Sequence, residues 1–455
     1  MTAYRPDPKI LELGPEFYDP VEPAVFPKCT PRFLNERWAE RVGLALDEAG
    51  WERHFCRFEP LPGNLSRPLA LRYHGHQFRV YNPEIGDGRG FLFAQLRDDR
   101  HRLLDLGTKG SGQTPYSRHA DGRLTLKGGV REVLAAEMLE ALGVNTSKTF
   151  ALFETGEALE RGDEPSPTRS AVLTRLSHGH IRIGTFQRLA FFGEDDNIRA
   201  LVRYCLANLY AEEPAADDGE NALRLFGLVS EATARLAASY LAAGFVHGVL
   251  NSDNINVTGE SFDYGPWRFT PEWDPAFTAA YFDHYGLYAF GRQPEAIQWD
   301  LAQLAGSLSL VTEAPPLSDM LAAWSNRFEQ ALVAAMSGRL GVDSDPGIVA
   351  ALIPALASRE APIDQIFFDW RGGRDPGADA YPSEPFRALA KALKGRERPQ
   401  SHPYWSDAQP CSMHIDEVEA IWSAIAERDD WRPFEDKVNA VRRMGDALRA
   451  DAPQD

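Results

Sequence analysis

The residue pattern of this chain changes near its middle, and that change most limits what the chain can fold into. From about residue 68 to residue 150, short apolar runs alternate with glycine-containing turns. Phe91–Leu96 and Arg102–Leu106 are typical of strands, and the apolar residues of Val130–Leu142 recur at helical spacing. Beyond Asp196 the apolar residues recur mainly at helical spacing. The sequence therefore predicts an α+β protein with a sheet-containing N-terminal half and a helical C-terminal half.

The same periodicity predicts the remaining elements. Residues 156–170 are polar and carry two prolines, so we expect an exposed loop there. A nucleotide often binds in the cleft between a sheet-containing part and a helical part. We expect the other helices at residues 34–46, 198–212, 222–243, 297–310, 317–336, 348–356, 414–428 and 434–450.

Charge and composition narrow the classes of function. The 455 residues include 48 Lys and Arg against 66 Asp and Glu, and the formal charge of −18 disfavours binding to nucleic acid or anionic membranes. The N-terminus lacks an apolar signal core, and no run approaches the roughly 18 apolar residues of a membrane span. Cys29, Cys56, Cys205 and Cys411 form no CxxC pair, and so few cysteines suggest reduced thiols. We therefore expect a cytoplasmic protein that binds neither nucleic acid nor membrane.

A glycine-rich turn, Gly86–Gly90, lies between two strand-like runs. Its glycines would let backbone N–H groups approach a phosphate, although the same letters also form ordinary hairpin turns. Lys109 follows the next strand, as the phosphate-binding lysine of a kinase does, and the string around it is not a Walker A motif. Glu132 falls in the first turn of the expected helix, where it would either orient Lys109 or interact with the helix dipole.

The segment Phe245–Asn254 carries the most specific pattern. His247 and Asn254 have the spacing of the HGDxxxxN string of small-molecule kinases, and Asp263-Tyr264-Gly265 stands where protein kinases have DFG. Amide and carboxylate oxygens suit Mg²⁺. The position of the kinase base is Val249, which cannot accept a proton, and a carboxylate appears instead at Asp253. The pattern predicts a nucleotide and metal site that departs from a standard kinase.

Two arginines, Arg175 and Arg182, could hold phosphate oxygens through bidentate hydrogen bonds, or form ordinary surface ion pairs. His178 and His180 lie between them, but without a third metal ligand nearby we expect these histidines to be structural. The histidines of Tyr73–Gln77 are interpreted in the same way.

Several short sequence motifs, taken in their order along the chain, resemble those of a known protein family. They are Tyr73–Phe78, Gly86–Arg89, Lys109–Gly112, Thr114–Arg118, Asp121–Arg123, Arg131-Glu132, Ser177–Arg182, Phe245–Asn254, Asp263–Pro266 and Gln293-Pro294. Together they span roughly residues 20–310, and in these strings the chain resembles the selenoprotein O family of kinase-like protein adenylyltransferases.

The resemblance implies a two-lobed, protein-kinase-like fold. Residues 1–65 would be an N-terminal extension, 66–155 the sheet-containing N-lobe, 156–340 the helical C-lobe and 341–455 a C-terminal helical extension. It also implies that ATP binds in a flipped orientation and that AMP is transferred to Ser, Thr or Tyr hydroxyls of proteins, the enzyme itself included. Mg²⁺ or Mn²⁺ would be the cofactor.

Roles for individual residues follow from the same resemblance. Asp253 would be the catalytic base, Glu132 would orient Lys109, and Asn254 and Asp263 would hold the metal ion. The nucleotide-binding residues would be Gly86, Gly88, Arg89, Lys109, Asp121, Gly122, Arg175, Arg182 and Asp263.

Two other classes of protein stay open. One is a phosphotransferase acting on a small molecule or a protein, which the HGxxxxxN spacing permits but Val249 disfavours. The other is a non-catalytic, nucleotide-binding pseudokinase scaffold, which would explain the missing carboxylate at position 249. A scaffold need not retain the oxygen ligands Asn254 and Asp263, which argues against it.

Overall fold

The structure is a computed structural model that describes residues 3–162 and 164–451. Residues 1, 2, 163 and 452–455 lie outside the described residues. They belong to the expected N-terminal extension, the expected loop at 156–170 and the expected C-terminal extension.

An antiparallel sheet of eight strands forms the N-terminal half. Its strands are β1 (Tyr18–Pro20), β2 (Thr30–Leu34), β3 (Leu69–Leu71), β6 (Leu92–Arg97), β7 (Leu103–Lys109), β8 (Leu124–Thr125), β9 (Lys148–Leu159) and β10 (Thr168–Ser177). They lie in the order β1-β3-β6-β7-β10-β9-β2, with β8 paired to β10. Two small hairpins stand apart from this sheet: β4 (Gly75–Gln77) with β5 (Val80–Asn82), and β11 (Phe245–Val246) with β12 (Arg268–Phe269).

The strands expected at 91–96 and 102–106 are confirmed as β6 and β7. The loop expected at 156–170 is wrong at both ends, because β9 continues to Leu159 and β10 begins at Thr168, its partner in the register. Leu159 and Thr168 are both buried, so the ends of this hairpin pack against the protein despite the polar composition between them. The sheet therefore includes β9 as far as Leu159 and β10 from Thr168 to Ser177.

Helix α3 (Leu126–Ala141) packs against β9 and β10. The hydroxyl of Thr125 accepts a hydrogen bond from the Gly128 N–H at 3.1 Å, which caps the N-terminus. Gly143 follows the helix with a φ of 80°, a conformation that favours glycine after a helix end. The helix expected at 130–142 is confirmed, but it begins four residues earlier. Glu132 is consequently in the second turn, and its expected place in the first turn was wrong.

The helical part follows β10. It comprises α4 (Ile183–Phe192), α5 (Asp195–Tyr204), α6 (Asp218–Ala243), α7 (Gln293–Leu308), α8 (Ala314–Ala322), α9 (Trp324–Leu340), α10 (Pro346–Ala357), α11 (Ile363–Asp369), α12 (Glu384–Leu393), α13 (Ile415–Arg428) and α14 (Arg432–Ala450), while α1 (Glu36–Arg41) and α2 (Glu48–Phe55) precede it. The single helix expected at 317–336 is two helices, because α8 ends before Ala323 and Trp324 turns into the core, stacking on Phe328. The other expected helices of this half are present, with shifted ends.

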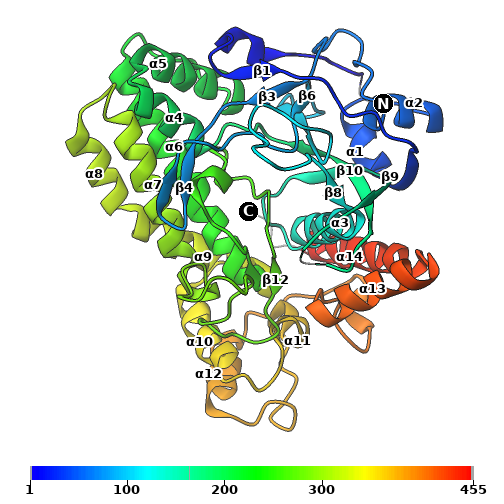
Figure 1. Ribbon diagram of the computed structural model, residues 1–455. Coiled ribbons are helices and arrows are strands. Elements are labelled where there is room, and N and C mark those ends of the chain that lie inside the picture. Colours follow the sequence, from blue (N-terminus) through cyan, green and yellow to red (C-terminus); the bar gives the residue numbers. More distant parts are fainter. Residues whose placement is uncertain (1–2, 163, 452–455) are drawn as a thin grey trace.

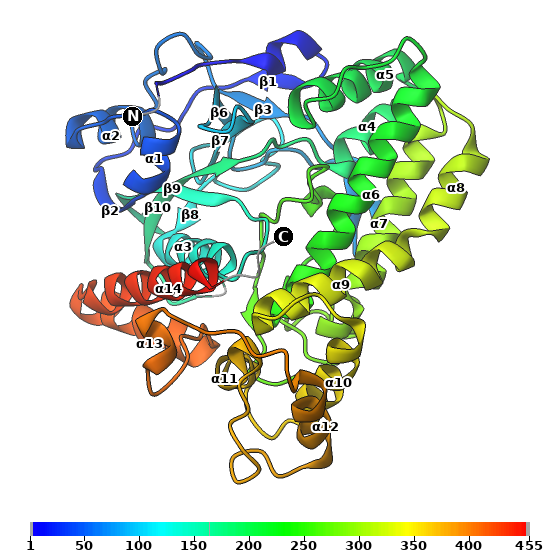
Figure 2. The same cartoon turned by 180° about the vertical axis from the view of Figure 1, so that it is seen from behind.

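The C-terminal helices return to the sheet-containing half (Figures 1 and 2). Helix α14 lies beside α3, and an added Cβ on Gly445 would come within 3.1 Å of the Ala141 Cβ, so the two helices are in close contact. Arg442 donates two hydrogen bonds, of 2.7 and 2.9 Å, to the buried Glu137 carboxylate of α3. Lys127 of α3 pairs with Glu419 of α13 at 2.7 Å. The last two helices of the chain, α13 and α14, thus contact the helix that carries Glu132.

A disulfide joins Cys29 to Cys56. The expectation of four reduced thiols is therefore wrong. The chain between β2 and α2 folds back and brings these two cysteines, 27 residues apart, into contact. Their spacing in the sequence alone does not show that they are close. Cys205 and Cys411 are free thiols. None of the helices in the described residues is long and apolar enough to cross a membrane.

Candidate nucleotide site

A cavity of about 480 Å³ lies where the sheet-containing part meets the helical part. Residues from both parts line it, so it depends on how the two are packed together. The lining residues are Tyr73, Gln77, Ile85, Gly86, Asp87, Gly88, Arg89, Gly90, Thr108, Lys109, Tyr116, Ser117, Arg118, Ala120, Arg175, Arg182, Val249, Asn251, Asp253, Asn254, Asp263 and Gly265.

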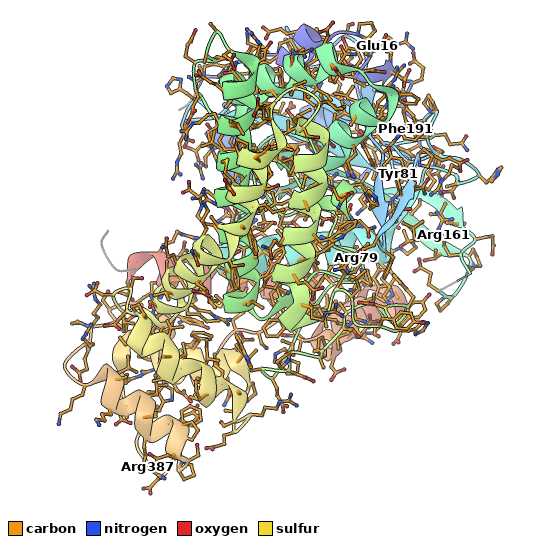
Figure 3. The ribbon with its side chains drawn as sticks, turned by 90° about the vertical axis from the view of Figure 1, so that its left-hand side faces the viewer. Glu16, Arg79, Tyr81, Arg161, Phe191 and Arg387 are labelled. Atoms are coloured by element: carbon orange, nitrogen blue, oxygen red, sulfur yellow. A yellow bond between two sulfur atoms is a disulfide. The ribbon has the colours of Figure 1, made fainter. Side chains whose placement is uncertain are left out.

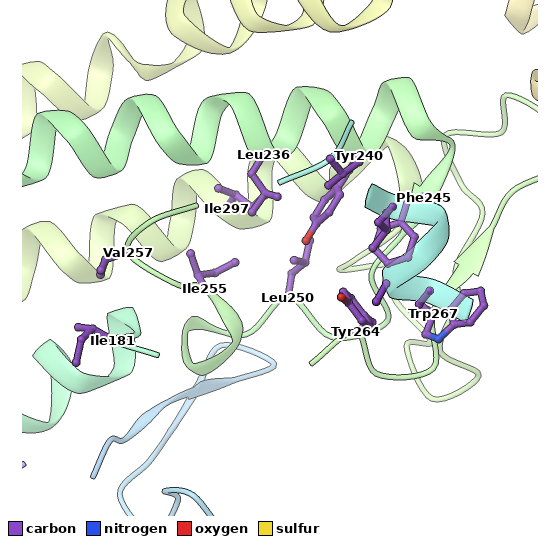
Figure 4. Close-up of a cluster of buried hydrophobic side chains, with 14 of the residues drawn as sticks. Ile181, Leu236, Tyr240, Phe245, Leu250, Ile255, Val257, Tyr264, Trp267 and Ile297 are labelled. Carbon is purple, nitrogen blue, oxygen red and sulfur yellow. The ribbon is translucent and has the colours of Figure 1, made fainter. Parts of the chain in front are cut away.

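The segment that carries Asp253 and Asn254 is held from both sides. Ser252–Asn254 form one 3-10 turn, and the buried side chains of Leu250 and Ile255 flank it. Figure 4 shows these two side chains among the core residues of α6 and α7. Tyr264, next to Asp263, is also buried and its hydroxyl lies 2.7 Å from that of Thr146. The turn and the segment that carries Asp263 are therefore fixed by packing before any ligand binds.

His247 connects these two segments. Its Nδ1 accepts a hydrogen bond from the Val249 N–H at 3.2 Å, and its Nε2 lies 3.1 Å from the carbonyl oxygen of Phe262. Burial lowers the pKa of His247 to about 4, so the ring is neutral and Nε2 carries the proton that the carbonyl accepts. His247 thus holds the residue before Asp263 in place.

Lys109 and Glu132 form an ion pair in the cavity wall. The Lys109 Nζ lies 2.6 Å from Glu132 Oε1 and 3.3 Å from Asp263 Oδ1. Lys109 ends β7 and Glu132 comes from the middle of α3, so the pair links the sheet to the helix. The sequence-based pairing of these two residues agrees with this geometry.

Three cations surround the Asp263 carboxylate. Arg175 Nη1 lies 2.6 Å from Oδ1, Arg182 Nη1 lies 3.3 Å from Oδ2, and Lys109 is the third. Burial alone would raise the pKa of Asp263, but attraction to these cations outweighs it and holds the pKa well below its usual range. Both arginines are buried, so they do not form the surface ion pairs that arginines commonly make.

Asp253 has a different environment, although it lies in the same cavity. Within the described part of the chain, nothing donates a hydrogen bond to its Oδ1, which is buried. Burial raises the pKa of Asp253 to about 6, against the opposing attraction of Arg182. Arg182 donates instead to the backbone carbonyl of Asp253 at 2.9 Å. A buried carboxylate with an unused oxygen and a raised pKa is suited to accepting a proton.

The glycine loop forms another wall. A Cβ on Gly86 would come within 2.5 Å of the Tyr116 ring, and one on Gly90 within 2.1 Å of the Thr108 carbonyl, so neither position admits a side chain. A Cβ on Gly88 would lie 3.0 Å from the Tyr116 carbonyl oxygen, which is a tight contact, and Arg89 is exposed at the rim. Because these three glycines have no side chains, the cavity stays open toward the backbone of the loop.

Asp121 and Gly122 are the two expected nucleotide-binding residues that do not line the cavity. The Asp121 carboxylate accepts hydrogen bonds from Arg161 at 2.9 and 3.1 Å and is exposed. Gly122 has a φ of 70°, and an added Cβ would lie 2.2 Å from the Gly112 carbonyl oxygen, so only glycine fits. Their neighbour Ala120 does line the cavity.

Sequence reasoning missed several lining residues. Asp87 is one: it accepts hydrogen bonds from the Leu71 N–H at 3.0 Å and from Arg182 at 3.3 Å. Its position inside the glycine string was a usable signal. Tyr73 is another, and the Arg182 guanidinium lies 4.3 Å from the centre of its ring. His180, expected to be structural, positions Arg175 by a contact of 3.2 Å between Nε2 and the guanidinium Nε.

The donor set for a metal ion is small. In residues 3–162 and 164–451 no three His, Cys, Asp or Glu side chains are grouped so as to hold a metal. Asn254 and Asp263 both line the cavity, and because Asn254 Nδ2 donates to the Val249 carbonyl at 3.0 Å, its amide oxygen is the end left for a cation. Two hard oxygen donors fit an ion such as Mg²⁺, which takes its other ligands from phosphates and water.

Known proteins are similar to this chain over nearly its whole length. The family profile described as "Protein adenylyltransferase SelO" matches residues 2–378. A protein nucleotidyltransferase YdiU of Synechocystis sp. is 40% identical, with 96% of this chain and 97% of that protein covered. A protein of the same description from Gloeobacter violaceus is 42% identical, with 96% and 95% covered. The resemblance in the motifs is confirmed, and the chain belongs to the SelO family of protein adenylyltransferases.

Proposed function

We propose that this protein transfers AMP from ATP to Ser, Thr or Tyr hydroxyls of acceptor proteins, with ATP bound in a flipped orientation. The observation that carries the proposal is the group of three cations, Lys109, Arg175 and Arg182, in one cavity with a buried carboxylate, Asp253, that has an unused oxygen. The cations match a polyphosphate, and the carboxylate matches a hydroxyl that must lose its proton.

The reaction is a displacement at the α-phosphorus. The acceptor oxygen forms a bond to that phosphorus, the bond from phosphorus to the bridging oxygen of the β-phosphate breaks, and pyrophosphate leaves. The hydroxyl proton passes to Asp253. Lys109, Arg175 and Arg182 bind the β- and γ-phosphates and stabilise the charge that develops on pyrophosphate, because they are fixed and desolvated beforehand. Glu132 orients Lys109 for this contact.

Asn254 and Asp263 would hold a divalent ion, Mg²⁺ or Mn²⁺. When bound, the ion neutralises phosphate charge and helps to orient the triphosphate. Asp263 already contacts the three cations, so the carboxylate also keeps them together in the absence of nucleotide. Gly86, Gly88 and Arg89 would contact the nucleotide from the glycine loop. Asp121 and Gly122, next to the lining residue Ala120, would contact it from the edge of the cavity.

The fold we propose is kinase-like and two-lobed. The antiparallel sheet with α3 corresponds to an N-lobe, and the helices from α4 to α9 correspond to a C-lobe. Residues 1–65 and 341–455 would be extensions at the two ends. Because β10 pairs within the sheet as far as Ser177, we place the boundary between the lobes after Ser177.

The position of the transferred label tests the proposal. The purified protein, given Mg²⁺ and a generic acceptor such as casein, should incorporate label from ATP labelled at the α-phosphate and not at the γ-phosphate. Intact-mass spectra should show the addition of whole AMP groups, and Asp253→Asn should abolish it. Label from the γ-phosphate alone would establish a phosphotransferase instead. ATP binding without label from either position would establish a pseudokinase scaffold.

A further inference from the structure

One face of strand β7 carries a charged residue that the reaction described above does not use. Asp105, Gly107 and Lys109 alternate along β7, so they lie on the same face of the sheet. Arg175 of β10 is the register partner of Gly107 and belongs to this face as well. Lys109 and Arg175 reach Asp263 from it, at 3.3 and 2.6 Å. Asp105 is the remaining charged residue of β7 on this face.

The ring of His180 lies between Asp105 and Arg175. Its Nδ1 lies 3.2 Å from Asp105 Oδ2, and its Nε2 accepts a hydrogen bond of 3.2 Å from the Arg175 Nε–H. A Cβ on Gly107 would come within 2.6 Å of the ring, so the ring occupies space that only a glycine leaves free. Asp105, His180 and Arg175 are all buried, so solvent has little access to these two contacts.

The position of the proton on His180 follows from its neighbours. A guanidinium nitrogen donates hydrogen bonds and cannot accept them, so His180 Nε2 must offer its lone pair to Arg175. The ring proton is then on Nδ1, and the Asp105 carboxylate accepts it. A proton on Nε2 would instead place two N–H groups against each other. Arg175 is therefore held in this orientation only by the Nδ1–H tautomer of His180.

Further hydrogen bonds lead from Asp105 to the N-terminal segment. Gln95 Nε2 donates to Asp105 Oδ1 at 2.7 Å, and Gln95 Oε1 accepts from the Ile10 backbone N–H at 2.6 Å. A backbone N–H can only donate, so it fixes which end of the Gln95 amide faces Asp105. One carboxylate oxygen is thereby committed to Gln95, and the other accepts from His180. We call Ile10, Gln95, Asp105, His180 and Arg175 the hydrogen-bond chain.

The segment in which the hydrogen-bond chain begins is itself held in place. Ile10 lies in a short 3-10 helix, Lys9–Leu13, which packs against α5, and its side chain is buried. The Asp7 N–H donates to the Gln95 carbonyl oxygen at 3.0 Å. Figure 3 shows this segment, labelled at Glu16, beside the first helices of the helical part. The Ile10 N–H is thus a fixed donor.

We propose that Asp105 is a positioning residue for the transfer reaction, which fixes the tautomer of His180 and through it the orientation of Arg175 toward the triphosphate. Because its Nε is bound to His180, Arg175 presents Nη1 and Nη2 to Asp263 and the cavity. An arginine side chain has several rotatable bonds, and fixing it beforehand lowers the entropy that ATP binding costs. This role rests on the proposed function, because the triphosphate of ATP is the group that Arg175 would bind.

Asp105→Asn tests the role in the full-length protein, because it keeps the shape of the side chain. The single oxygen of the new amide would stay with Gln95, and its NH2 group would face His180 Nδ1. Nδ1 would then have to accept, and the ring proton would move to Nε2, against the Arg175 N–H. We expect the dissociation constant of ATP with Mg²⁺, measured by calorimetry, to rise about tenfold, as for the loss of one charge-assisted contact.

Asp98→Asn is the matched control. Asp98 follows β6 and is buried as Asp105 is, but its carboxylate pairs with Arg102 and does not line the cavity. This variant also loses a buried carboxylate of the sheet-containing part, and its affinity for ATP should equal that of the unsubstituted protein. A difference between the two variants therefore reports the place of Asp105 in the hydrogen-bond chain and not a general effect of removing a buried charge.

Two further measurements separate positioning from a structural role. In an Arg175→Ala background, Asp105→Asn should leave ATP binding unchanged, because a residue that acts through Arg175 has nothing left to act on. Nitrogen-15 NMR of protein labelled at histidine, with His180 assigned by the signal that His180→Gln removes, reports the tautomer directly. We expect the Nδ1–H tautomer in the unsubstituted protein and the Nε2–H tautomer in Asp105→Asn.

Other outcomes would overturn the inference in distinguishable ways. A proton on Nε2 of His180 in the unsubstituted protein would contradict the hydrogen-bond chain, even if Asp105→Asn does not fold. Equal ATP binding by Asp105→Asn and Asp98→Asn, or an undiminished loss in the Arg175→Ala background, would show that Asp105 does not act through Arg175. If the protein binds ATP but transfers no AMP, the proposed function fails, and ATP binding still decides the role of Asp105. If it binds no ATP, both fail.

Discussion

Replacing Arg442 with alanine should test whether α14 holds α3 in its working position. Arg442 makes a bidentate contact, at 2.7 and 2.9 Å, with Glu137, whose side chain is only 3% exposed. The Glu137 position is one helical turn and a half beyond Glu132 on the same helix. The substitution removes the main partner of a buried charge and loosens the contact between the two helices.

The size of the effect can be worked out from the surroundings. Removing one partner of a buried ion pair costs about 3–5 kcal/mol. Here the Arg442 side chain is 29% exposed, and Arg37 remains 3.7 Å from Glu137 as a second cation. Both features reduce the penalty, so we expect a loss of about 2–3 kcal/mol in the free energy of unfolding.

Arg443→Ala is the matched control. Arg443 is the next residue on α14, and its ion pair with Asp407 is open to solvent, so the pair contributes little to the free energy of unfolding. Thermal melting should place Arg442→Ala several degrees below the parent and Arg443→Ala close to it. At a temperature where both remain folded, AMP transfer by Arg442→Ala should be about tenfold slower, because a small displacement of a positioning group is costly.

The coupling between Arg442 and Glu137 can be measured separately. Glu137→Gln and the double variant complete a cycle with Arg442→Ala, and we expect a coupling energy of about 1–3 kcal/mol between the two side chains. Equal melting temperatures for Arg442→Ala and Arg443→Ala would refute the reasoning about the buried pair. A destabilised Arg442→Ala variant with full transfer activity would refute the link from α14 through α3 to the site.

Three more predictions concern the site. Asp263→Asn should remove most of the rise in melting temperature that ATP with Mg²⁺ gives. It should also lower the melting temperature of the nucleotide-free protein, because three cations lose their shared partner. An equal rise with ATP and Mg²⁺ in the variant and the parent would show that Asp263 does not bind the metal ion. Glu132→Gln should lower kcat for AMP transfer more than it weakens ATP binding, and steady-state kinetics with equal kcat would contradict its orienting role. Gly86→Ala should weaken ATP binding measured by calorimetry, because its Cβ would meet the Tyr116 ring at 2.5 Å, and Tyr116→Ala in the same chain should restore part of the loss; no loss would show that the loop adapts.

Residues whose role depends on local spacing could be predicted from the sequence. His247, Asn254 and Asp263 lie in one short stretch, and the structure brings Asn254 and Asp263 into the cavity while His247 holds the segment. Lys109 and Glu132 were also paired from the order of strand and helix. The α+β organisation followed from the change in periodicity, because sheet and helix impose different spacings on apolar residues.

Features that depend on contacts between distant segments were missed. The disulfide of Cys29 and Cys56 requires the path of the chain between them. The ion pair of Asp121 with Arg161, 40 residues further on, likewise depends on the path of the chain between them. The polar composition of 156–170 predicted a loop, while pairing with buried partners extends both strands into it.

The contact between α14 and α3 also sets the order in which the protein can be completed. Glu137 and Arg442 are 305 positions apart in the chain. A ribosome working at ~5–20 residues per second needs roughly 15 to 60 s to pass from one to the other. During that interval the helix that carries Glu132 has already emerged, but the surface that supports it does not yet exist. Helix α14 can therefore contact α3 only after nearly the whole chain has been made. A nascent or C-terminally truncated chain lacks this contact, which holds α3 and with it the Glu132 that orients Lys109.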